Sequence, residues 1–217
     1  MINTKLTNIV QALIPEARIE TFDIAQAGLS LFLINEDYPQ GALPSDVAYQ
    51  LMEQPLYWAF CWASGAVLAT YIRNNVDLVK DKSIIDFGSG SGVVAIAAAK
   101  AGAKKVVACD IDSNALLAIK ANAKLNQVDI ELSEDFDRLQ GEFDLLTAAD
   151  VLYDRENLPW LDKFKDKSKH VLLADSRIKN FDHPNYFRLG QFDSCTLPDL
   201  DESEEFRKVS LYSTISF

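Results

Sequence analysis

The chain has 217 residues, with 32 acidic and 21 basic side chains and a formal net charge of −11. A hydrophobic fraction of 48% is ordinary for a globular protein and excludes intrinsic disorder, and the length fits one domain or one domain with a small appendage. The acidic balance argues against a nucleic-acid partner, because binding to phosphates needs concentrated Lys and Arg.

The N-terminal part of the chain predicts a small α/β appendage. Apolar side chains recur at helical spacing within residues 3–14, and residues 18–24 and 29–35 have the composition of two extended segments joined by a turn. No catalytic spacing is recognisable in this part. We therefore expect residues 1–55 to pack on, or cover, a main domain that comprises residues 56–217.

An uncharged run of 17 residues, 56–72, opens the main domain. This length lies at the lower limit for a membrane-spanning helix. Because the run contains Ser64, Gly65 and Thr70 and is flanked by soluble patterning, we interpret it as a buried helix and expect no membrane association.

From residue 80 onward, short apolar strands alternate with helical segments. The expected strands are residues 83–87, 105–109, 130–132, 143–149 and 170–174, and the expected helices are residues 93–100, 113–126 and 155–168. Residues 208–216 alternate in polarity and suit an edge strand that closes the sheet. Such alternation is typical of βαβ units, so the sequence predicts a doubly wound α/β domain with a parallel sheet.

The first of these strands ends in a glycine-rich loop, residues 86–92, at the edge where open α/β sheets bind ligands. A phosphate-binding P-loop is excluded because no lysine lies between Lys82 and Lys100, and Val93 stands where the dinucleotide fingerprint needs glycine. The remaining pattern, Asp86 followed by Gly-x-Gly-x-Gly, is the one used for S-adenosyl-L-methionine. We therefore expect that cofactor.

Acidic residues follow the next two strands at the same edge of the sheet. Asp110 lies 22 residues after Gly88, where a carboxylate can accept hydrogen bonds from both hydroxyls of a ribose. We assign Asp112 to capping the following helix. Asp135 either accepts a hydrogen bond from the adenine amino group or is a solvated loop acid, and the sequence leaves both interpretations open.

The fourth strand ends in Ala149-Asp150-Val151-Leu152-Tyr153-Asp154. An Asp-x-x-Tyr motif at the mouth of a cofactor cleft can hold a cation beside an aromatic ring. The alternative is that Tyr153 belongs to the core and that Asp150 caps the following turn.

These motifs together resemble those of the class I, seven-β-strand S-adenosylmethionine-dependent methyltransferases. More narrowly, they are similar to the lysine methyltransferases that modify the β-subunit of electron transfer flavoprotein. The resemblance covers roughly residues 50–217 and, more loosely, the N-terminal segment. It also rests on residues 55–62, which resemble a Pro-Tyr-Trp-x-x-x-Trp segment, and on the C-terminal tail. It implies a mostly parallel seven-stranded Rossmann-like methyltransferase sheet and a protein substrate that presents a lysine.

The resemblance also implies roles for individual residues of the cofactor site. Trp62, which otherwise would be a core residue, packs against the cofactor, with Gly88 and Gly90 beside its methionine portion. Asp110 holds the ribose, and Ala149 lines the floor near the sulfonium.

The expected catalytic residues follow from the chemistry of the lysine side chain. A lysine with a pKa near ~10.4 is protonated at neutral pH and has no lone pair for attack. The site must therefore bind the cation and then help it to lose a proton. We expect Asp150 to hold and orient the amine and Tyr153 to shape the lysine channel.

Two segments depart from the family pattern. After Trp62 the family has Pro-Gly-Gly-Gln, whereas this chain has Ala-Ser-Gly-Ala at residues 63–66. The fifth strand of the family runs into Gly-Asp-Pro-Gly-Arg, whereas this chain has Ala-Asp-Ser-Arg at residues 174–177. Both segments are expected to border the cleft, so these departures concern which protein substrate is bound.

Four other functions compete with this interpretation. A small-molecule N- or O-methyltransferase shares the cofactor half, and a ribosomal-protein methyltransferase shares the cofactor motifs but typically carries an Asn-Ile-type segment where this chain has Asp150. A binding module without catalysis has no physical need for the intact motifs. A nicotinamide-dependent dehydrogenase lacks its fingerprint and a hydride-transfer acid or base at the strand ends.

The cysteines bear on compartment and metals. Cys61, Cys109 and Cys195 lie far apart, and with two histidines they offer no zinc spacing, so no metal is expected. An odd number of cysteines without a secretory leader indicates free thiols in a reducing compartment. We therefore expect a cytoplasmic protein.

Overall fold

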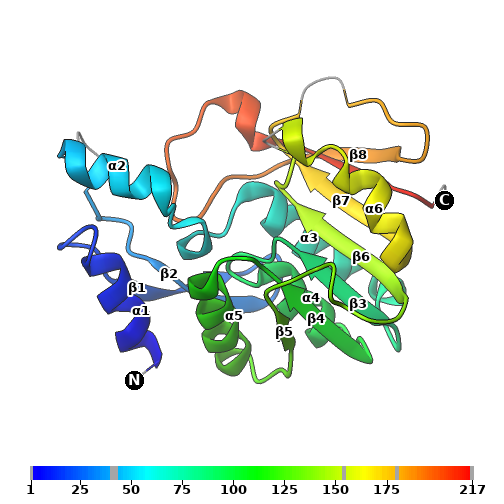
Figure 1. Ribbon diagram of the computed structural model, residues 1–217, viewed down its shortest axis with the longest axis horizontal. Helices are drawn as coiled ribbons and strands as arrows, with labels where there is room; N and C mark the ends of the chain where they lie inside the picture. The colour runs from blue at the N-terminus through cyan, green and yellow to red at the C-terminus, as the bar shows by residue number, and fades with distance from the viewer. Residues whose placement is uncertain (1, 40–43, 153–154, 179–180, 216–217) are drawn as a thin grey trace.

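A seven-stranded sheet with helices on both faces forms the centre of the computed structural model, which describes residues 2–39, 44–152, 155–178 and 181–215 (Figure 1). The strands of the sheet are β3 (Ser83–Phe87), β4 (Lys105–Cys109), β5 (Glu131–Ser133), β6 (Phe143–Ala149), β7 (Ser168–Asp175), β8 (Phe187–Asp193) and β9 (Lys208–Ser213). They lie in the order β5-β4-β3-β6-β7-β9-β8. The first five run parallel, and β9 is antiparallel to both of its neighbours, β7 and β8. The mostly parallel, doubly wound sheet is therefore confirmed.

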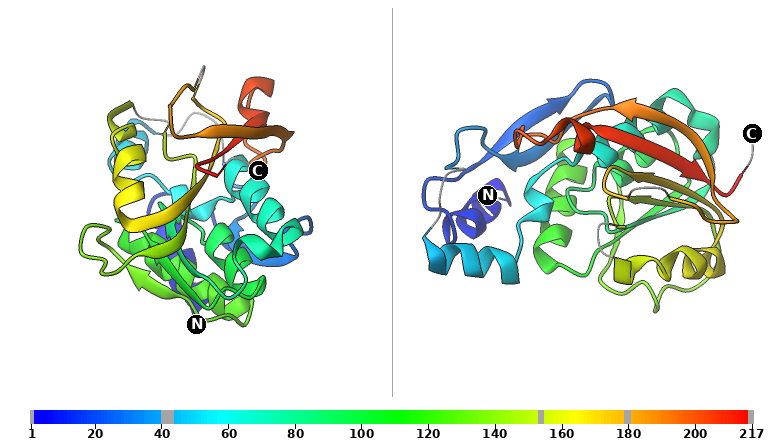
Figure 2. Two further views of the ribbon diagram at one scale, coloured as in Figure 1. Left: turned by 90° about the vertical axis from the view of Figure 1, so that its right-hand side faces the viewer. Right: turned by 90° about the horizontal axis from the view of Figure 1, so that it is seen from above.

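Different helices cover the two faces of the sheet. Helices α3 (Ala63–Asn74) and α4 (Val93–Lys100) pack on one face, and α6 (Trp160–Lys167) packs on the other (Figure 2). Neighbouring strand residues alternate between the faces, so Ile84 of β3 joins the core with α3 and α4 while Ile85 joins the core with α6. Burial on both sides explains why most residues in the middle of the central strands are apolar.

The first 55 residues form their own small elements at the left of Figure 1. These are α1 (Ile2–Gln11), β1 (Ile19–Ile24), β2 (Leu29–Ile34) and α2 (Ser45–Glu53). The strands β1 and β2 pair antiparallel as a separate two-stranded sheet, and β2 and α1 both pack on α5 (Ser113–Leu125). The division of the chain at residue 55 stays a prediction.

Asn122 of α5 and Asn126, the C-cap residue of this helix, form hydrogen bonds with the backbone of β2. The Asn126 side chain donates to the Ser30 carbonyl at 2.6 Å and accepts from the Ser30 N–H at 3.0 Å. The buried Asn122 accepts from the Phe32 N–H at 2.7 Å and donates to the Ser91 carbonyl at 2.8 Å. The Asn122 amide thus joins the N-terminal strands to the glycine-rich loop.

Most predicted elements are confirmed, and β3, α4, β4 and β6 have the predicted bounds. The buried helix predicted over residues 56–72 is correct only from Ala63 onward, because η1 (Tyr57–Ala59) and an extended stretch precede α3. The helix predicted over residues 155–168 divides into η3 (Arg155–Asn157) and α6, with Pro159 as the N-cap of α6.

The prediction of a closing edge strand was wrong. β9 lies inside the sheet, and the edge is β8, which the sequence did not predict. The residues of β8 are exposed or half-buried and include Gly190, so this strand lacks the apolar pattern of its neighbours. The helix α2 was also not predicted. Three further short helices are η2 (Val76–Leu78), η3 and η4 (Glu204–Arg207).

A membrane span can be assessed for the described part of the chain. None of its helices combines the length and the apolar character that crossing a bilayer requires.

The bridging role of Asn122 can be tested by Asn122→Ala, which leaves the Phe32 N–H and the Ser91 carbonyl unpaired. An unpaired buried group costs roughly 1–3 kcal/mol, so we expect the free energy of unfolding to fall by at least that amount in urea titrations. Lys120→Ala, an exposed change on the same helix, is the control and should shift stability by less than about 0.5 kcal/mol. Equal stability of the two variants would contradict the bridging role.

Candidate active site

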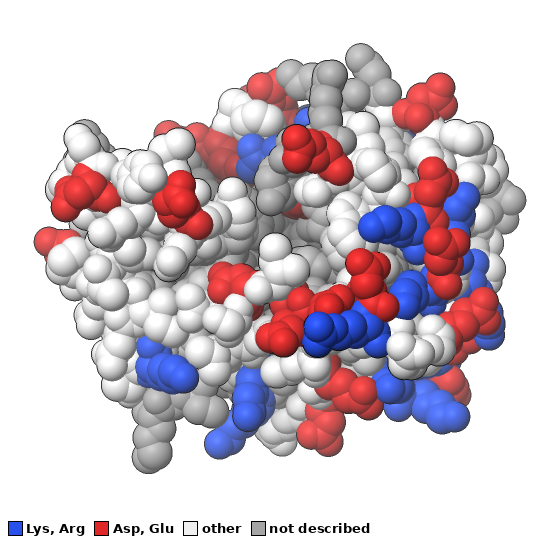
Figure 3. All heavy atoms as spheres, in the orientation of Figure 1, with Lys and Arg blue, Asp and Glu red and all other residues white. Residues whose placement is uncertain are grey.

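The predicted site residues gather at one edge of the sheet. Because β3, β4, β6 and β7 run parallel, the loops after them meet at their carboxyl ends, and the strand order reverses between β3 and β6. These loops carry Gly88, Asp110 and Asp150. The face drawn in Figure 3 is hollowed near its centre, between the N-terminal part on the left and the α6 part on the right.

The glycine-rich loop needs glycine at two positions beside this edge. Gly88 has a φ of +63°, and a Cβ there would meet Val151 Cγ1 at 3.0 Å. Gly90 has a φ of +53°, and the nearest atom to a Cβ there would be the Gly88 carbonyl oxygen at 4.0 Å. The backbone of Gly90 is therefore open to a ligand that approaches closely.

Asp86 lies beneath the loop, at 2% exposure. Its carboxylate accepts hydrogen bonds from the hydroxyls of Ser89 and Thr147, the latter at 2.8 Å from Oγ1 to Oδ1. Burial raises the pKa of Asp86 to about 6, and the two hydroxyl bonds oppose that shift. These contacts support a bracing role under the loop, and direct contact between Asp86 and a cofactor stays a prediction.

Asp110 presents both carboxylate oxygens beside the loop. Oδ2 accepts from the Gly90 N–H at 2.8 Å, and Oδ1 accepts from the Asp112 N–H at 3.0 Å. Burial raises the pKa of Asp110, while these two N–H groups oppose the shift. Since each carboxylate oxygen has about two lone pairs, each keeps one for a further donor. That arrangement suits a pair of adjacent hydroxyls.

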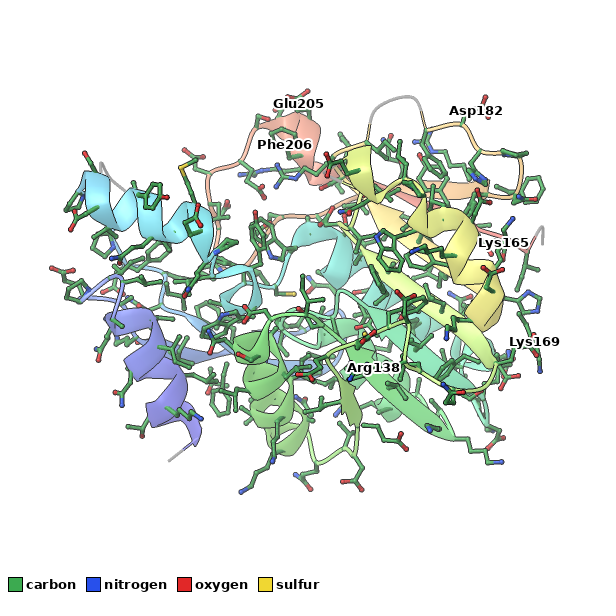
Figure 4. The ribbon with its side chains drawn as sticks, in the orientation of Figure 1. Arg138, Lys165, Lys169, Asp182, Glu205 and Phe206 are labelled. Atoms are coloured by element: carbon green, nitrogen blue, oxygen red, sulfur yellow. The ribbon has the colours of Figure 1, made fainter. Side chains whose placement is uncertain are left out.

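The remaining acidic candidates take different positions. Asp112 is the N-cap of α5 and accepts from the Asn114 N–H at 2.8 Å, which confirms its assignment as a cap. Asp135 accepts from the N–H groups of Asp137 and Arg138 and forms an ion pair at 3.0 Å with the Arg138 guanidinium, which Figure 4 labels. Asp135 therefore orders its own loop, and a contact with adenine stays a prediction.

An open pocket of about 350 Å³ lies beside Asp135. Its lining mixes apolar and polar side chains from α5 and from the end of β5, namely Leu116, Leu132, Ser133, Glu134, Asp135 and Arg138. It adjoins the Asp110 region along the same sheet edge, because β5 pairs with β4. A flat base can enter between such side chains.

Trp62 is half-buried immediately before α3. Its indole N–H donates to the Tyr57 carbonyl at 2.9 Å, and the rings of Tyr57 and Phe60 lie 5.8 Å and 5.6 Å from its own. The guanidinium of Arg177 lies 5.9 Å from the Trp62 ring. Trp62 is thus fixed by its neighbours and borders the segment that follows β7.

Asp150 adopts a strained backbone conformation just after the half-buried Ala149, with a φ of +51°. Such a conformation costs of order 1–3 kcal/mol in a residue other than glycine and persists only where its surroundings enforce it. Here the Asp150 N–H donates to the Ala174 carbonyl at 3.0 Å, and the Asn157 side chain holds the Val151 carbonyl at 2.8 Å. Tyr153, the other expected catalytic residue, lies outside the described residues.

Asp175, at the end of β7, ties two loops together. Its carboxylate accepts from the N–H groups of Leu152 at 3.3 Å, Arg177 at 2.8 Å and Ile178 at 2.7 Å. Burial first, and then the neighbouring charge of Asp150, raise the pKa of Asp175. The Asp175 carboxylate therefore joins the backbone of the segment after β6 to the backbone of the segment after β7.

The Asp150 carboxylate itself accepts hydrogen bonds from Ser64 and Ser176. The sequence analysis assigned no role in the site to these serines and identified both as departures from the family pattern. Their signal was that each places a hydroxyl in a segment expected to border the cleft.

The C-terminal segment closes one side of the site. Cys61 and Leu197 exchange two backbone hydrogen bonds, of 2.8 Å and 2.9 Å, just before Trp62. Arg177 forms an ion pair with Glu202, and its guanidinium lies 4.1 Å from the ring of Phe206, which Figure 4 labels. The sequence did not predict these contacts, because they join residues far apart in the chain.

A metal site can be assessed only for the described residues. They contain no group of three or more His, Cys, Asp or Glu side chains that could hold a metal ion.

The buried Asp86 gives a prediction for pH. Its folded-state pKa of about 6 exceeds the ordinary value of 3.8, so the folded state binds this proton more tightly than the unfolded state does. The free energy of unfolding from this group therefore decreases as the pH rises from about 4 to about 6. Because Asp86→Asn cannot ionise, we expect its stability relative to the unsubstituted protein to rise over this interval, by as much as about 3 kcal/mol. Urea titrations at several pH values measure this, with the exposed Asp166→Asn as control; parallel pH curves for Asp86→Asn and the unsubstituted protein would refute the expectation.

The chain matches known proteins over much of its length. A family model described as ribosomal protein L11 methyltransferase (PrmA) matches residues 68–154. The electron transfer flavoprotein beta subunit lysine methyltransferase of Rattus norvegicus is 36% identical over 152 residues, which are 66% of this chain and 60% of that protein. The chain therefore spans about three fifths of the length of this curated relative.

Solved structures agree with the fold. The ribosomal protein L11 methylase of Lactobacillus delbrueckii subsp. bulgaricus is similar with a TM-score of 0.51 and 22% identity, over 69% of this chain and 77% of that one. The magnesium protoporphyrin IX methyltransferase of Synechocystis PCC 6803 with bound SAM has a TM-score of 0.51 and 14% identity, over 81% of this chain and 98% of that one. Sequence similarity and fold together place the chain among the class I methyltransferases.

Proposed function

We propose that the chain transfers a methyl group from S-adenosyl-L-methionine to a lysine side chain of a protein. The observation that carries the proposal is the placement of the Asp150 carboxylate. It is held at the carboxyl end of β6, next to the glycine loop after β3 and to the segment after β7. A fixed carboxylate at that place can bind a cationic amine beside the bound methyl donor.

The residues at the sheet edge fit the cofactor. Gly90 leaves room for close approach, Gly88 allows the loop its positive φ beside Val151, and Asp110 keeps one lone pair on each oxygen for the two ribose hydroxyls. The open pocket beside Asp135 can take the adenine, and Trp62 can pack against the methionine portion. The rat relative is named a methyltransferase, and the Synechocystis structure contains bound SAM.

The transfer depends mainly on positioning. The bound cofactor supplies an activated methyl group. The protein must therefore place the amine nitrogen in line with the methyl carbon–sulfur bond, which breaks as the carbon–nitrogen bond forms and leaves a neutral thioether. Asp150 attracts the ammonium form and orients it, and the amine then releases its proton to solvent water, because the partly buried site disfavours the charged form. Tyr153, as the wall of the lysine channel, is part of the proposal, as is the position of Ala149 near the sulfonium.

The β-subunit of electron transfer flavoprotein, or a protein like it, is the substrate that the similarity to the rat relative supports. A ribosomal protein is the second candidate, favoured by the family model over residues 68–154. A small-molecule substrate remains the alternative to both. The cytoplasmic location and the absence of nucleic-acid and membrane partners stay predictions.

Asp150→Asn tests the proposed role of the carboxylate. The amide keeps the shape but not the charge, so we expect turnover to fall roughly 100-fold while the affinity for S-adenosyl-L-methionine stays within about twofold. Transfer of radiolabelled methyl groups into a cell lysate, resolved by size, measures turnover and shows the substrate class. Asp166→Asn, an exposed change on α6, is the matched control.

Each outcome of the lysate experiment has a distinct meaning. Label in a discrete protein band that disappears with Asp150→Asn supports protein methylation and gives the mass of the target. Label confined to small molecules moves the assignment to a metabolite. Unchanged turnover in Asp150→Asn removes Asp150 from the proposed mechanism.

Asp110→Ala tests the ribose assignment separately. Losing two charge-assisted hydrogen bonds should weaken binding of S-adenosyl-L-methionine by roughly 10-fold to 100-fold in a calorimetric titration. The exposed Asp129→Ala serves as the control. Equal affinities for the two variants would refute a contact between Asp110 and the ribose.

A further inference from the structure

We propose that Ser64 and Ser176 are positioning residues for the reaction, which clamp the Asp150 carboxylate so that its Oδ2 atom receives the substrate amine. The inference rests on the proposed function, because it takes Asp150 as the group that binds the amine. It adds two residues to the site and assigns different tasks to the two carboxylate oxygens.

Four hydrogen bonds from two segments hold the carboxylate. The Ser64 hydroxyl donates to Oδ1 at 2.6 Å, and the Ser64 N–H donates to Oδ2 at 3.3 Å. The Ser176 hydroxyl and the Ser176 N–H both donate to Oδ1, at 2.9 Å and 3.1 Å. Each serine thus donates hydrogen bonds to the Asp150 carboxylate through both its hydroxyl and its backbone N–H.

The distribution of these bonds distinguishes the two oxygens. A carboxylate offers about four lone-pair positions, two on each oxygen. Oδ1 accepts three hydrogen bonds and is saturated, whereas Oδ2 accepts, among the described residues, one bond at the long distance of 3.3 Å. Oδ2 therefore retains the capacity to accept a hydrogen bond from an incoming ammonium group.

The placement of the serines makes this clamp rigid. Ser64 is fully buried in the first turn of α3, where backbone N–H groups lack partners within the helix. Ser176 follows directly after Asp175, whose carboxylate fixes the N–H groups of Arg177 and Ile178. One carboxylate thereby joins the start of α3, the end of β6 and the end of β7.

The two departures from the family pattern converge at this point. Ser64 stands where that pattern has the first glycine of Pro-Gly-Gly-Gln, and Ser176 stands where it has Pro-Gly. Neither of those positions carries a hydroxyl in the pattern. Residues far apart in the sequence thus both supply a hydroxyl to the same oxygen, Asp150 Oδ1, at 2.6 Å and 2.9 Å.

The test uses Ser64→Ala and Ser176→Ala in the full chain, each alone and combined with Asp150→Asn. Initial rates of radiolabel transfer to the protein band, measured over a series of lysate dilutions, give kcat and KM relative to the unsubstituted protein, and calorimetry gives the affinity for S-adenosyl-L-methionine. Because bonds to a charged group are at stake, we expect each single change to lower kcat roughly 10-fold and to leave cofactor affinity within about twofold. In the Asp150→Asn background, neither serine change should lower the residual kcat further.

Two control variants separate positioning from simple loss of packing. Ser176→Thr keeps a hydroxyl and should retain kcat within about threefold. Ser168→Ala removes a buried hydroxyl that donates to the Phe164 carbonyl at 2.9 Å, away from the clamp, and should leave kcat unchanged. If Ser64→Ala fails to fold, the half-buried Ser176 carries the same comparison alone.

The outcomes distinguish this inference from the proposed function. Full activity of Asp150→Asn overturns the proposed function and the clamp with it. An inactive Asp150→Asn together with unchanged kcat in both serine variants overturns the clamp alone. Serine effects that persist undiminished in the Asp150→Asn background also overturn it, since the serines would then act independently of the carboxylate.

Discussion

The structure of the site depends on supplying hydrogen-bond donors to carboxylates at one edge of the sheet. Four such carboxylates lie at the carboxyl ends of neighbouring parallel strands: Asp86 and Asp175 within the last two residues of β3 and β7, and Asp110 and Asp150 directly after β4 and β6. Burial of a carboxylate is unfavourable unless N–H or O–H groups replace the lost water. The loops after these strands meet that requirement with backbone N–H groups and serine hydroxyls, and Thr147 inside β6 adds a hydroxyl.

Segments from both ends of the chain fix the surroundings of this edge. At the N-terminal side, β2 is bonded to α5 through Asn122 and Asn126. At the C-terminal side, the backbone of Leu197 pairs with that of Cys61 next to Trp62. Parts of the chain that lie outside the strand-helix alternation therefore pack against the elements that carry the predicted site residues.

Much of the sheet could be predicted from the sequence, because apolar strands such as residues 83–87 and 143–149 are buried on both faces. Strand β8 could not, since an edge strand with exposed side chains has no apolar pattern to recognise. The motif residues at strand ends were identified because strand direction alone brings them together. The serines at positions 64 and 176 could not be assigned, because their contacts with Asp150 span 86 and 26 residues of sequence. Only the packing of α3 and β7 around β6 creates them.

The Asn122 amide has a thermodynamic consequence for the whole molecule. Its NH₂ group donates a hydrogen bond to the carbonyl of Ser91 in the glycine loop, and its oxygen accepts one from the N–H of Phe32 in β2. Any ligand that orders this loop also strengthens the attachment of β2, and linkage requires that attachment of β2 favours the ligand by the same free energy. A shortened chain without its first 55 residues would therefore have a different affinity for such a ligand. The hydrogen bond between Asn122 and β2, which contributes to the free energy that orders the loop, would have been removed with those residues.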